Sequence, residues 1–376
     1  MRVLHIITGL STGGAETMLF KLLSGIDKNR FHCAVVSLSD TGTLGPGIVN
    51  MGIPVYALNM RPGTPNIAGL LKLGRIIRKF RPNLVQGWMP HGNLMALLSV
   101  IFTCRNVPVV WNIRQSLYSL AYETPGTARL IRLAAKLSWL PKAIVYNSAI
   151  SASQHEALGY RAGKRLLIPN GFDCQRFAPN MNARIALREK LGIAQSAILI
   201  GLAARFHPMK DHASFLRAAA LLARERGDIH FVLAGAGVDS GNQELTQLIQ
   251  SLGVEQKAHL LGEVGDMPGF FAALDIATSS SITEAFPNAV GEAMACAVPC
   301  VVTDVGASGY IVGDSGLVIL PNDPAALVYA WRKLLALGAE MRGKLGNQAR
   351  HRILDNFSLD AVVAQYENLY HSLRSC

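Results

Sequence analysis

The sequence predicts an α/β protein of two doubly wound domains, each a parallel sheet covered by helices. The chain has 376 residues, more than one hydrophobic core usually holds, which favours two domains of roughly 150 to 200 residues. Short apolar runs alternate with longer runs of helical periodicity, a pattern typical of βαβ units. The alternation begins again after the turn-rich stretch Pro169–Asp173, so the domains are expected at residues 1–172 and 173–356.

In the first half, apolar β-type runs and amphipathic runs follow each other in order. The expected strands are Val3–Ile7, Cys33–Leu38, Val55–Leu58, Leu84–Gln86, Val107–Trp111 and Ala143–Asn147. The expected helices are Glu16–Ser24, Ile67–Phe80, Asn93–Phe102 and Thr127–Leu140.

The second half repeats the pattern after a charged connector at Arg184–Leu191. Its expected strands are Ala197–Ala203, His230–Ala234, Ala258–Leu261, Ile276–Thr278, Cys300–Thr303 and Leu317–Leu320. Its expected helices are Ala213–Arg226, Gln243–Leu252, Pro268–Leu274, Asn288–Ala295, Pro324–Leu337 and Leu359–Arg374. Ligands of open parallel sheets bind beyond the carboxyl ends of the strands, so two such domains are expected to face a central cleft.

The composition is that of a folded chain without a membrane span. Half of the residues are apolar and 16% are charged, which argues against disorder. The apolar run Leu94–Phe102 is too short to cross a bilayer, which needs about 20 residues, and the run at the N-terminus is too short for a secretory signal. The cysteines show no metal or redox spacing and fit a cytoplasmic protein with reduced thiols: 33, 104, 174, 296, 300 and 376.

The positive charge is concentrated in the first half of the chain. The net charge is +11, but residues 1–170 hold 19 Lys or Arg against 5 Asp or Glu, whereas residues 171–376 hold 17 against 20. A nucleic-acid-binding protein is therefore an alternative. The basic residues lack interleaved aromatic residues and any binding motif, which argues against it.

Two segments of the first half follow strands and carry candidate ligand-binding groups. The loop from Thr8 to Glu16 contains Gly13 and Gly14 ahead of a helix, where backbone N–H groups can approach a phosphate. Trp88 and His91 follow the strand at Leu84 and open a helix. A tight strand-to-helix turn is the alternative for the glycines, and a capping or packing role is the alternative for His91. Asn112 and Arg114 form a further polar cluster after a strand.

In the second half, Arg205 and Lys210 leave the first strand of the domain and precede a helix. Two cations in that position suit a diphosphate. Further on, Glu284 lies in a turn before a helix and Glu292 lies about two turns inside it. Pro287 marks the first helical turn, which leaves N–H groups there to bind hydroxyls or an anion. Glu292 stands in an apolar run, so its carboxylate is expected to have hydroxyl partners.

Together these residues resemble glycosyltransferase family 4, the large retaining group with the GT-B fold, and the likeness covers nearly the whole chain. The E-x7-E signature of that family is matched by Glu284 and Glu292. The agreement extends to further positions in the right order: Gly13–Glu16, His91, Pro169–Gly171 with Asp173, Arg205 and Lys210.

The resemblance implies a role for each matched position. Arg205 and Lys210 would neutralise the donor diphosphate as it leaves, and Glu292 would bind the ribose hydroxyls of the nucleotide. Glu284 would hold donor-sugar hydroxyls together with backbone N–H groups of the segment Ala285, Phe286, Pro287 and Asn288. Gly13 and Gly14 would approach the diphosphate, and His91 would contact the donor sugar near the reacting carbon. The helix in residues 357–376 would return to the first domain.

The expected activity is that of a hexosyl- or related glycosyltransferase (EC 2.4 class) that moves a sugar, by default from a UDP-sugar, to a glycan or lipid-linked acceptor in cell-surface polysaccharide synthesis. The chain has no D-x-D motif, so we expect neither a metal ion nor another cofactor. Where family members often carry an acidic residue before Ile311-Val312, this sequence has Gly309-Tyr310. Another GT-B-like enzyme, such as a sugar-nucleotide epimerase or a phosphorylase, is the alternative. A phosphorylase would need a pyridoxal-phosphate lysine context that the sequence does not show.

The basic first half is expected to bind the acceptor, with Trp88, Asn112 and Arg114 on the acceptor side. Two of its helices are basic and amphipathic, and such helices can lie on anionic lipid. The protein is therefore expected in the cytoplasm, peripheral on the inner face of the cell membrane, with no nucleic-acid partner. The alternative is that the apolar faces of these helices pack on the sheet. The residues concerned are Leu73, Ile76, Ile77 and Phe80 with Lys72, Arg75 and Lys79, and then Arg129, Arg132 and Lys136.

Overall fold

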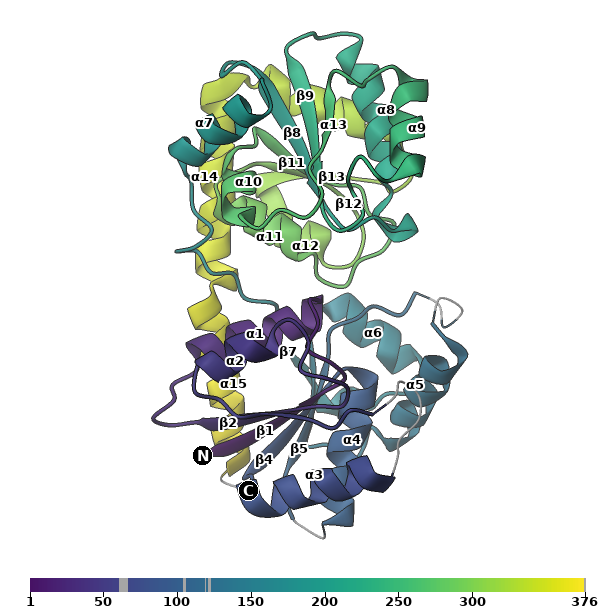
Figure 1. The fold of residues 1–376 in the computed structure, drawn as a ribbon, viewed down its shortest axis with the longest axis vertical. Coiled ribbons are helices and arrows are strands. Elements are labelled where there is room, and N and C mark those ends of the chain that lie inside the picture. Colours follow the sequence, from purple (N-terminus) through teal and green to yellow (C-terminus); the bar gives the residue numbers. More distant parts are fainter. Residues whose placement is uncertain (61–66, 104–105, 119, 121–122, 375–376) are drawn as a thin grey trace. The chain divides into compact units, whose positions relative to one another are not determined.

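The computed structural model describes residues 1–60, 67–103, 106–118, 120 and 123–374. The chain divides into two compact units, each an α/β domain (Figure 1). Unit 1 comprises Met1–Gly171 and Leu359–Cys376, and unit 2 comprises Phe172–Ser358. The chain thus passes from one unit to the other at Gly171 and again at Ser358, whereas the sequence places the boundaries after residues 172 and 356.

Among the described residues of unit 1, the strands form a seven-stranded parallel sheet in the order β3-β2-β1-β4-β5-β6-β7. The strands are β1 (Arg2–Ile7), β2 (His32–Ser37), β3 (Val55–Ala57), β4 (Leu84–Trp88), β5 (Val109–Ile113), β6 (Ala143–Tyr146) and β7 (Arg165–Leu167). The helices are α1 (Gly14–Gly25), α2 (Gly45–Asn50), α3 (Ile67–Phe80), α4 (Met89–Phe102), α5 (Pro125–Leu137), α6 (Ala149–Ala157), the short 3-10 turn η2 (Ala162–Lys164) and α15 (Leu359–Arg374).

The central strands of the unit 1 sheet are buried on both faces, which is why they are mostly apolar. Along β1, Leu4 and Ile6 join the core under α3, α4 and α5, whereas Val3 and Ile7 join the core under α1 and α15. The alternation follows from the period of two residues in a strand.

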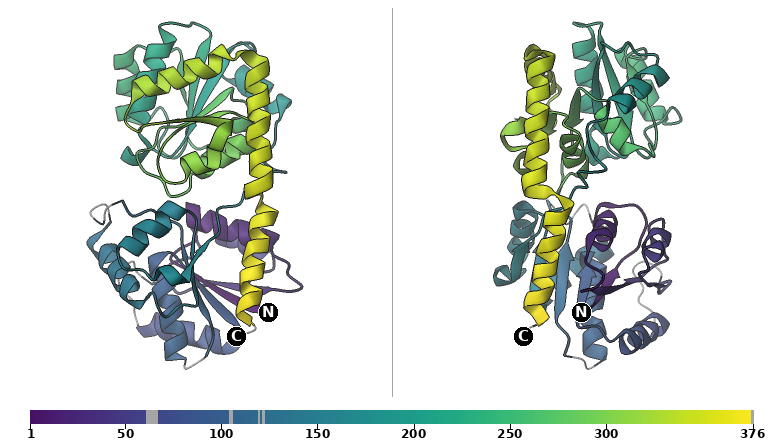
Figure 2. Two further views of the ribbon diagram at one scale, coloured as in Figure 1. Left: turned by 180° about the vertical axis from the view of Figure 1, so that it is seen from behind. Right: turned by 90° about the vertical axis from the view of Figure 1, so that its left-hand side faces the viewer.

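The C-terminal helix α15 belongs to unit 1, and Figure 2 shows it in yellow beside the strands of that unit. Val362, Val363, Tyr366 and Tyr370 are buried among residues of β1, β4 and α1. The returning helix that the sequence predicts therefore supplies part of the hydrophobic core of unit 1.

Among the described residues of unit 2, a six-stranded parallel sheet has the order β10-β9-β8-β11-β12-β13. The strands are β8 (Ile198–Ala203), β9 (Ile229–Ala234), β10 (Ala258–Leu260), β11 (Ile276–Ser279), β12 (Cys300–Thr303) and β13 (Gly316–Ile319). The helices are α7 (Met181–Lys190), α8 (His212–Ala223), α9 (Gln243–Leu252), α10 (Met267–Ala272), α11 (Asn288–Ala295), α12 (Ser308–Val312), α13 (Pro324–Ala336) and α14 (Gly338–Phe357), with 3-10 turns η3 (Pro208–Lys210) and η4 (Gly313–Ser315).

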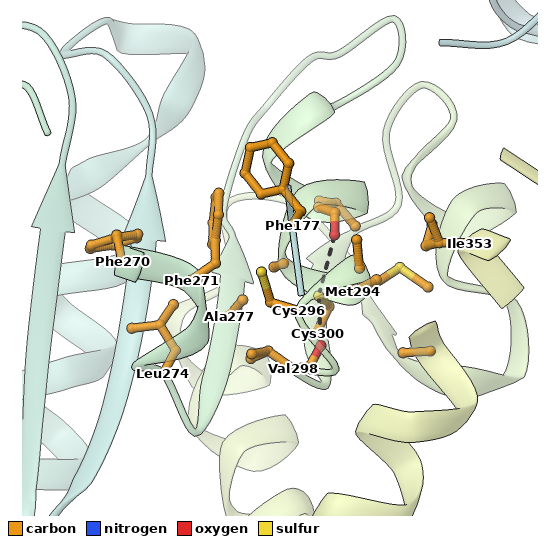
Figure 3. Packing of buried hydrophobic residues seen from close by; sticks show 14 of the residues in the cluster. Phe177, Phe270, Phe271, Leu274, Ala277, Met294, Cys296, Val298, Cys300 and Ile353 are labelled. Atoms are coloured by element: carbon orange, nitrogen blue, oxygen red, sulfur yellow. Dashed lines mark hydrogen bonds between the residues drawn. The ribbon is translucent and has the colours of Figure 1, made fainter. Parts of the chain in front are cut away.

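The core beneath α11 joins that helix to the sheet of unit 2. Figure 3 shows Met294 and Cys296 close to Ala277 of β11 and Cys300 of β12, with Phe271 and Leu274 beside them. The Cys300 thiol lies 3.6 Å from the carbonyl oxygen of Val298. The apolar side of α11 is therefore fixed against the strands.

Several elements differ from the sequence-based expectation. The connector at Arg184–Leu191 is mostly helix α7, and the long helix α14 lies where no helix is expected. The apolar stripe of α3 lies in the core: Leu73, Ile76 and Ile77 are buried against the sheet and Phe80 is partly buried beside them. The stripe is thus not available to a membrane. In the described part of the chain, no helix is both long and apolar enough to span a bilayer.

Candidate active site

In unit 2, the strand order reverses between β8 and β11, which are neighbours in the sheet although β9 and β10 separate them in the sequence. The loops that follow these two strands therefore diverge at the carboxyl edge of the sheet, where open α/β sheets bind their ligands. The candidate donor residues of the second half occupy these two loops and the start of α11.

The loop after β8 carries Arg205 and Lys210 into helix α8. Arg205 is exposed and forms no ion pair with any described residue. Lys210 ends the short turn η3, and Asp211 after it adopts a left-handed backbone with φ of 48°. Asp211 then caps α8, because its Oδ1 accepts a hydrogen bond of 3.0 Å from the backbone N–H of Ser214. The cap fixes where the loop ends and the helix begins.

Glu284 belongs to the segment after β11 and is in contact with Lys210. The Lys210 Nζ donates to Oε1 of Glu284, and both side chains are mostly buried, with 23% and 13% exposed. The Ser281 hydroxyl donates to the same carboxylate oxygen at 2.8 Å. The fold thus joins the two charged residues that the sequence singles out in separate loops.

Glu292 and the segment Ala285, Phe286, Pro287 and Asn288 lie around the start of α11. Pro287 is the N-cap residue of this helix and provides no side-chain hydrogen bond to it. Phe286 is buried and stacks on Phe172, with ring centroids 6.2 Å apart. Glu292 is partly buried in the second turn of the helix, whereas Ala293 and Met294 beside it are fully buried.

The loop after β12 packs closely on the Glu284 segment. Gly306 has a φ of 57°, and a Cβ on it would lie 2.2 Å from the carbonyl oxygen of Glu284. The backbone N–H of Ala307 donates to the carbonyl of Ala285 at 3.0 Å. Tyr310 is 65% exposed, and its carbonyl accepts a hydrogen bond of 2.6 Å from Arg352. The segment that departs from the family pattern is thus helix α12, tied to α14.

The loop after β8 is electropositive. Desolvation lowers the pKa of His207, and the positive charges of Arg205 and Lys210 lower it further. The His207 Nδ1 accepts from the backbone N–H of Met209 at 3.2 Å, which fits a neutral ring. The positive charge of this loop therefore comes from Arg205 and Lys210, and these two side chains can attract an anionic ligand.

His91 lies at the corresponding switch point of unit 1, where β1 and β4 are neighbours. It belongs to the first turn of α4, two residues after Met89, which has a left-handed backbone with φ of 64°. Gly92 permits the sharp turn, because a Cβ there would lie 2.4 Å from the carbonyl oxygen of Ile6. Partial burial lowers the pKa of His91, so the imidazole is neutral near pH 7.

Gly13 and Gly14 follow β1 at the same switch point of unit 1. Gly13 is the N-cap residue of α1 without a side-chain cap, and a Cβ on it would lie 2.4 Å from a carboxylate oxygen of Glu16. Gly14 is exposed, with no heavy atom within 4 Å of the place a Cβ would take. Burial raises the pKa of the Glu16 carboxyl beside this helix start.

The three residues expected on the acceptor side are buried inside unit 1. Trp88 and Asn112 are fully buried and Arg114 is 7% exposed. The Arg114 guanidinium donates to Oδ1 of Asn112 at 2.8 Å, to Oδ1 of Asn170 at 2.8 Å and to the hydroxyl of Tyr366 on α15. Their polar groups are thus engaged within the protein. In this structure the three side chains therefore support the interior of unit 1, and the acceptor role expected from the sequence stays a prediction.

The described residues show no group of three or more His, Cys, Asp or Glu side chains that could hold a metal ion. Cys33 and Cys296 are buried free thiols whose pKa burial raises to about 12, so they are poor nucleophiles. Cys104 and Cys376 lie outside the described residues.

Sequence reasoning missed two serines in the candidate site. Ser280 and Ser281 directly follow β11 and are almost fully buried. The signal was present, because polar residues that follow a strand lie at the ligand edge of a parallel sheet. The sequence predicts that the strand ends at Thr278, one residue before the end of β11, and gives no local pattern that marks the two serines as part of the site.

The fold of the whole chain is that of known two-domain glycosyltransferases. The structure of Alr3699/HepE from Anabaena in complex with UDP matches with a TM-score of 0.86 at 22% sequence identity, covering 99% of this chain and 100% of that one. A glycosyltransferase from Rickettsia africae ESF-5 matches with a TM-score of 0.85 at 19% identity, covering 99% and 98%. The chain therefore has the GT-B fold.

Two family models match successive parts of the chain. The model described as "Glycosyltransferase Family 4" matches residues 12–176, and the model described as "Glycosyl transferases group 1" matches residues 197–336. The chain belongs to the glycosyltransferases, with a family 4 domain in its first half and a group 1 domain in its second. Its enzyme class is the one expected from the sequence.

Curated relatives agree with this assignment. The putative glycosyltransferase EpsF of Bacillus subtilis is 27% identical over 334 residues, which is 81% of this chain and 79% of that protein. The UDP-Gal:alpha-D-GlcNAc-diphosphoundecaprenol alpha-1,3-galactosyltransferase of Escherichia coli is 24% identical over 54% of this chain and 53% of that protein. A D-inositol 3-phosphate glycosyltransferase of Geodermatophilus obscurus is 32% identical over 59% of this chain. The match spans about half the length of these last two relatives.

Proposed function

We propose that this glycosyltransferase transfers a sugar, with retention of anomeric configuration, from a UDP-sugar to a hydroxyl group of a glycan or lipid-linked acceptor in cell-surface polysaccharide synthesis. The observation that carries the donor site is the contact of Lys210 with Glu284 at the switch point of the unit 2 sheet, with Arg205 exposed in the same loop. The UDP in the complex of the similar Anabaena protein supports the choice of nucleotide.

Within unit 2, the basic and the acidic residues bind different parts of the donor. Arg205 and Lys210 attract the diphosphate and stabilise the negative charge that develops on it as the sugar departs. Glu284 and Glu292 accept hydrogen bonds from hydroxyl groups, Glu284 from the sugar and Glu292 from the ribose. Backbone N–H groups of the segment from Ala285 to Asn288 add donors at the start of α11.

Unit 1 contributes residues whose roles follow from the family resemblance. His91 contacts the donor sugar through a neutral imidazole, and Gly13 and Gly14 bring backbone N–H groups to the diphosphate. Trp88, Asn112 and Arg114 are not included among the acceptor contacts, because their side chains are buried.

We expect no metal ion in this reaction, since two cationic side chains supply the charge that a divalent ion provides in other transferases. Transfer measured in excess EDTA should equal transfer measured with Mg²⁺. A loss of more than tenfold in EDTA, restored by added Mg²⁺ or Mn²⁺, would contradict this part of the proposal.

The donor site is tested by thermal unfolding in the presence of a panel of nucleotide sugars: UDP-glucose, UDP-galactose, UDP-N-acetylglucosamine, GDP-mannose and ADP-glucose. We expect a UDP-sugar to raise the Tm of the wild type and to have little effect on Arg205→Ala or Glu292→Ala. Arg224→Ala and Glu255→Ala are matched controls, because both residues are exposed and precede strands at the opposite edge of the sheet. Equal shifts in all variants would remove the assigned residues from the donor site.

A peripheral position on an anionic membrane is the second part of the proposal. Unit 1 exposes apolar side chains at the ends of α4 and α5, with Phe102 66% and Trp139 61% exposed, and basic residues along α5, including Arg129, Arg132 and Lys136. Basic residues attract anionic lipid by roughly 1 kcal/mol each near the surface. The protein should float with anionic liposomes and not with neutral ones. Equal flotation of the wild type and a variant with these three residues replaced by Gln would exclude this mode.

A further inference from the structure

Two buried serines connect the candidate donor residues to the sheet of unit 2. Ser280 and Ser281 follow the last residue of β11 and are 1% and 2% exposed. Buried hydroxyl groups are nearly always hydrogen-bonded, and the partners they choose show what they hold in place. Each of these serines bonds to a different one of the two candidate donor loops.

Ser281 holds the carboxylate of Glu284. Its Oγ donates to Glu284 Oε1 at 2.8 Å, and Lys210 contacts the same oxygen. The backbone of Ser281 is anchored in turn, because its carbonyl accepts a hydrogen bond of 2.6 Å from Oγ1 of Thr303 at the end of β12. The orientation of the carboxylate is therefore set by a hydroxyl group fixed to the sheet.

Ser280 holds the loop that carries Lys210. Its Oγ lies 2.9 Å from the carbonyl oxygen of Lys210 and 3.0 Å from that of Asp211. Asp211 has a positive φ, which is uncommon for a residue with a side chain and needs support from its surroundings. A hydrogen bond from Ser280 to this turn stabilises it, and the turn sets the direction in which Lys210 leaves the backbone.

We propose that Ser280 and Ser281 are positioning residues for the donor, an inference that rests on the proposed function. Ser281 orients Glu284 towards the hydroxyl groups of the donor sugar. Ser280 holds the Lys210 loop where it meets the diphosphate. Neither hydroxyl touches the substrate, and the two serines serve different parts of it.

The division of roles is tested with UDP and UDP-glucose as probes, by calorimetric titration of Ser281→Ala and Ser280→Ala. UDP lacks the sugar, so Ser281→Ala should weaken binding of UDP-glucose roughly tenfold and leave binding of UDP unchanged. Ser280→Ala should weaken both ligands about equally. Loss of both ligands in Ser281→Ala, or of neither ligand in both variants, would overturn the proposal.

Ser315→Ala is the matched control. Ser315 is also buried in unit 2, and its hydroxyl donates to the carbonyl of Val312 at 2.6 Å. It precedes β13 and so lies at the edge of the sheet opposite to Ser281. This variant loses a hydrogen bond of the same kind and should bind both probes like the wild type.

A double-mutant cycle separates positioning from a general structural role. If Ser281 acts through Glu284, Ser281→Ala should lower the affinity for UDP-glucose less than twofold further in a Glu284→Ala background, which lacks the carboxylate that Ser281 orients. A serine that only supports the fold would cause the same loss in both backgrounds. Equal losses would therefore overturn the assignment. Ser281→Cys, which is close in size and a weak donor, should repeat the result if the alanine variant does not fold.

Crystal structures of the ligand-free variants test whether Ser281 positions Glu284. This test does not depend on which donor the enzyme uses. In Ser281→Ala the Glu284 carboxylate should leave its position beside Lys210, and in Ser315→Ala it should not. An unmoved carboxylate would overturn the inference. A wild type that binds neither UDP nor UDP-glucose would instead contradict the proposed donor.

Discussion

At the scale of single residues, Lys210 and Glu284 are two opposite charges that the protein keeps together while both are mostly buried. A ligand diphosphate offers Lys210 a second partner of higher charge, so the lysine is suited to stabilise a leaving group. Replacing Lys210 by Met should lower kcat/KM by about 100-fold or more, the usual size of losing one preorganised charge at a reacting group.

The control for Lys210→Met is Lys190→Met, which replaces an exposed lysine at the end of α7 and should leave kcat/KM unchanged. Steady-state kinetics with the donor identified in the panel provide the measurement. A loss below threefold in Lys210→Met would place the leaving-group charge on other residues.

Buried histidines make unit 1 sensitive to acid. His155 is fully buried between Tyr146 and Tyr160, and burial lowers its pKa from 6.5 to about 4. The unfolded chain takes up a proton near pH 6.5 and the folded protein only near pH 4. Folding stability is therefore complete above pH 6.5 and decreases below it, by about 1.4 kcal/mol per pH unit for this group.

The variant His155→Phe retains an aromatic ring and has no titrating group. Its free energy of unfolding, measured in urea from pH 7 to pH 4.5, should decrease less steeply with falling pH than that of the wild type. Parallel curves for the two proteins would show that His155 does not contribute to the acid sensitivity.

At the scale of the elements, α11 is packed so closely that one of its positions accepts only glycine. A Cβ on Gly291 would lie 2.1 Å from the ring of Phe172, which is fully buried and stacked on Phe286. The ring has no room to yield, so Gly291→Ala should destabilise unit 2 by about 1–3 kcal/mol through overpacking.

The same substitution elsewhere has the opposite sign. Gly343 lies within α14 with no heavy atom within 4 Å of its Cβ position, so Gly343→Ala should stabilise the protein by about 0.5–1 kcal/mol. Urea unfolding of both variants provides the measurement. Equal effects would show that helix propensity alone, and not the Phe172 contact, decides the outcome.

Some elements follow from the sequence because their pattern is strong. The helices Ile67–Phe80, Gln243–Leu252 and Asn288–Ala295 have the bounds that periodicity predicts. Helix α14 is missed because it is largely polar, and two of the five residues on its buried face, Arg342 and Gly346, are not apolar side chains. The other three, Ala349, Ile353 and Phe357, have helical spacing but form a weak apolar signal in a charged segment.

The candidate site shows the same limit. That Lys210 and Glu284 lie near each other is consistent with the rule that the carboxyl ends of adjacent parallel strands lie at one edge of a sheet. The burial of Arg114 does not follow from any local pattern, because Tyr366, its hydrogen-bond partner, lies 252 residues further along the chain. A polar residue that follows a strand is thus predicted to lie at the carboxyl edge of the sheet. Whether its side chain is exposed there is not predicted.

At the scale of the whole molecule, the chain leaves unit 1 at Gly171 and returns to it at Leu359. Helix α15 supplies buried residues to unit 1, including Val362, Tyr366 and Tyr370. It also supplies the Tyr366 hydroxyl, so unit 1 without α15 loses one of the acceptors of the buried Arg114 guanidinium, which is destabilising. Unit 1 is thus incomplete until the last residues of the chain are present.

The fragment of residues 1–171 should therefore not unfold cooperatively on its own, and a peptide of residues 359–376 added in excess should restore a cooperative transition. The fragment of residues 172–358 is the control, since its core clusters contain residues of unit 2 alone and it should unfold cooperatively without help. Circular dichroism during urea titration provides the measurement. A peptide carrying Tyr366→Phe should restore unit 1 less well, because it lacks one of the acceptors of the buried Arg114 guanidinium. A cooperative transition of the 1–171 fragment without any peptide would show that α15 is dispensable for its core.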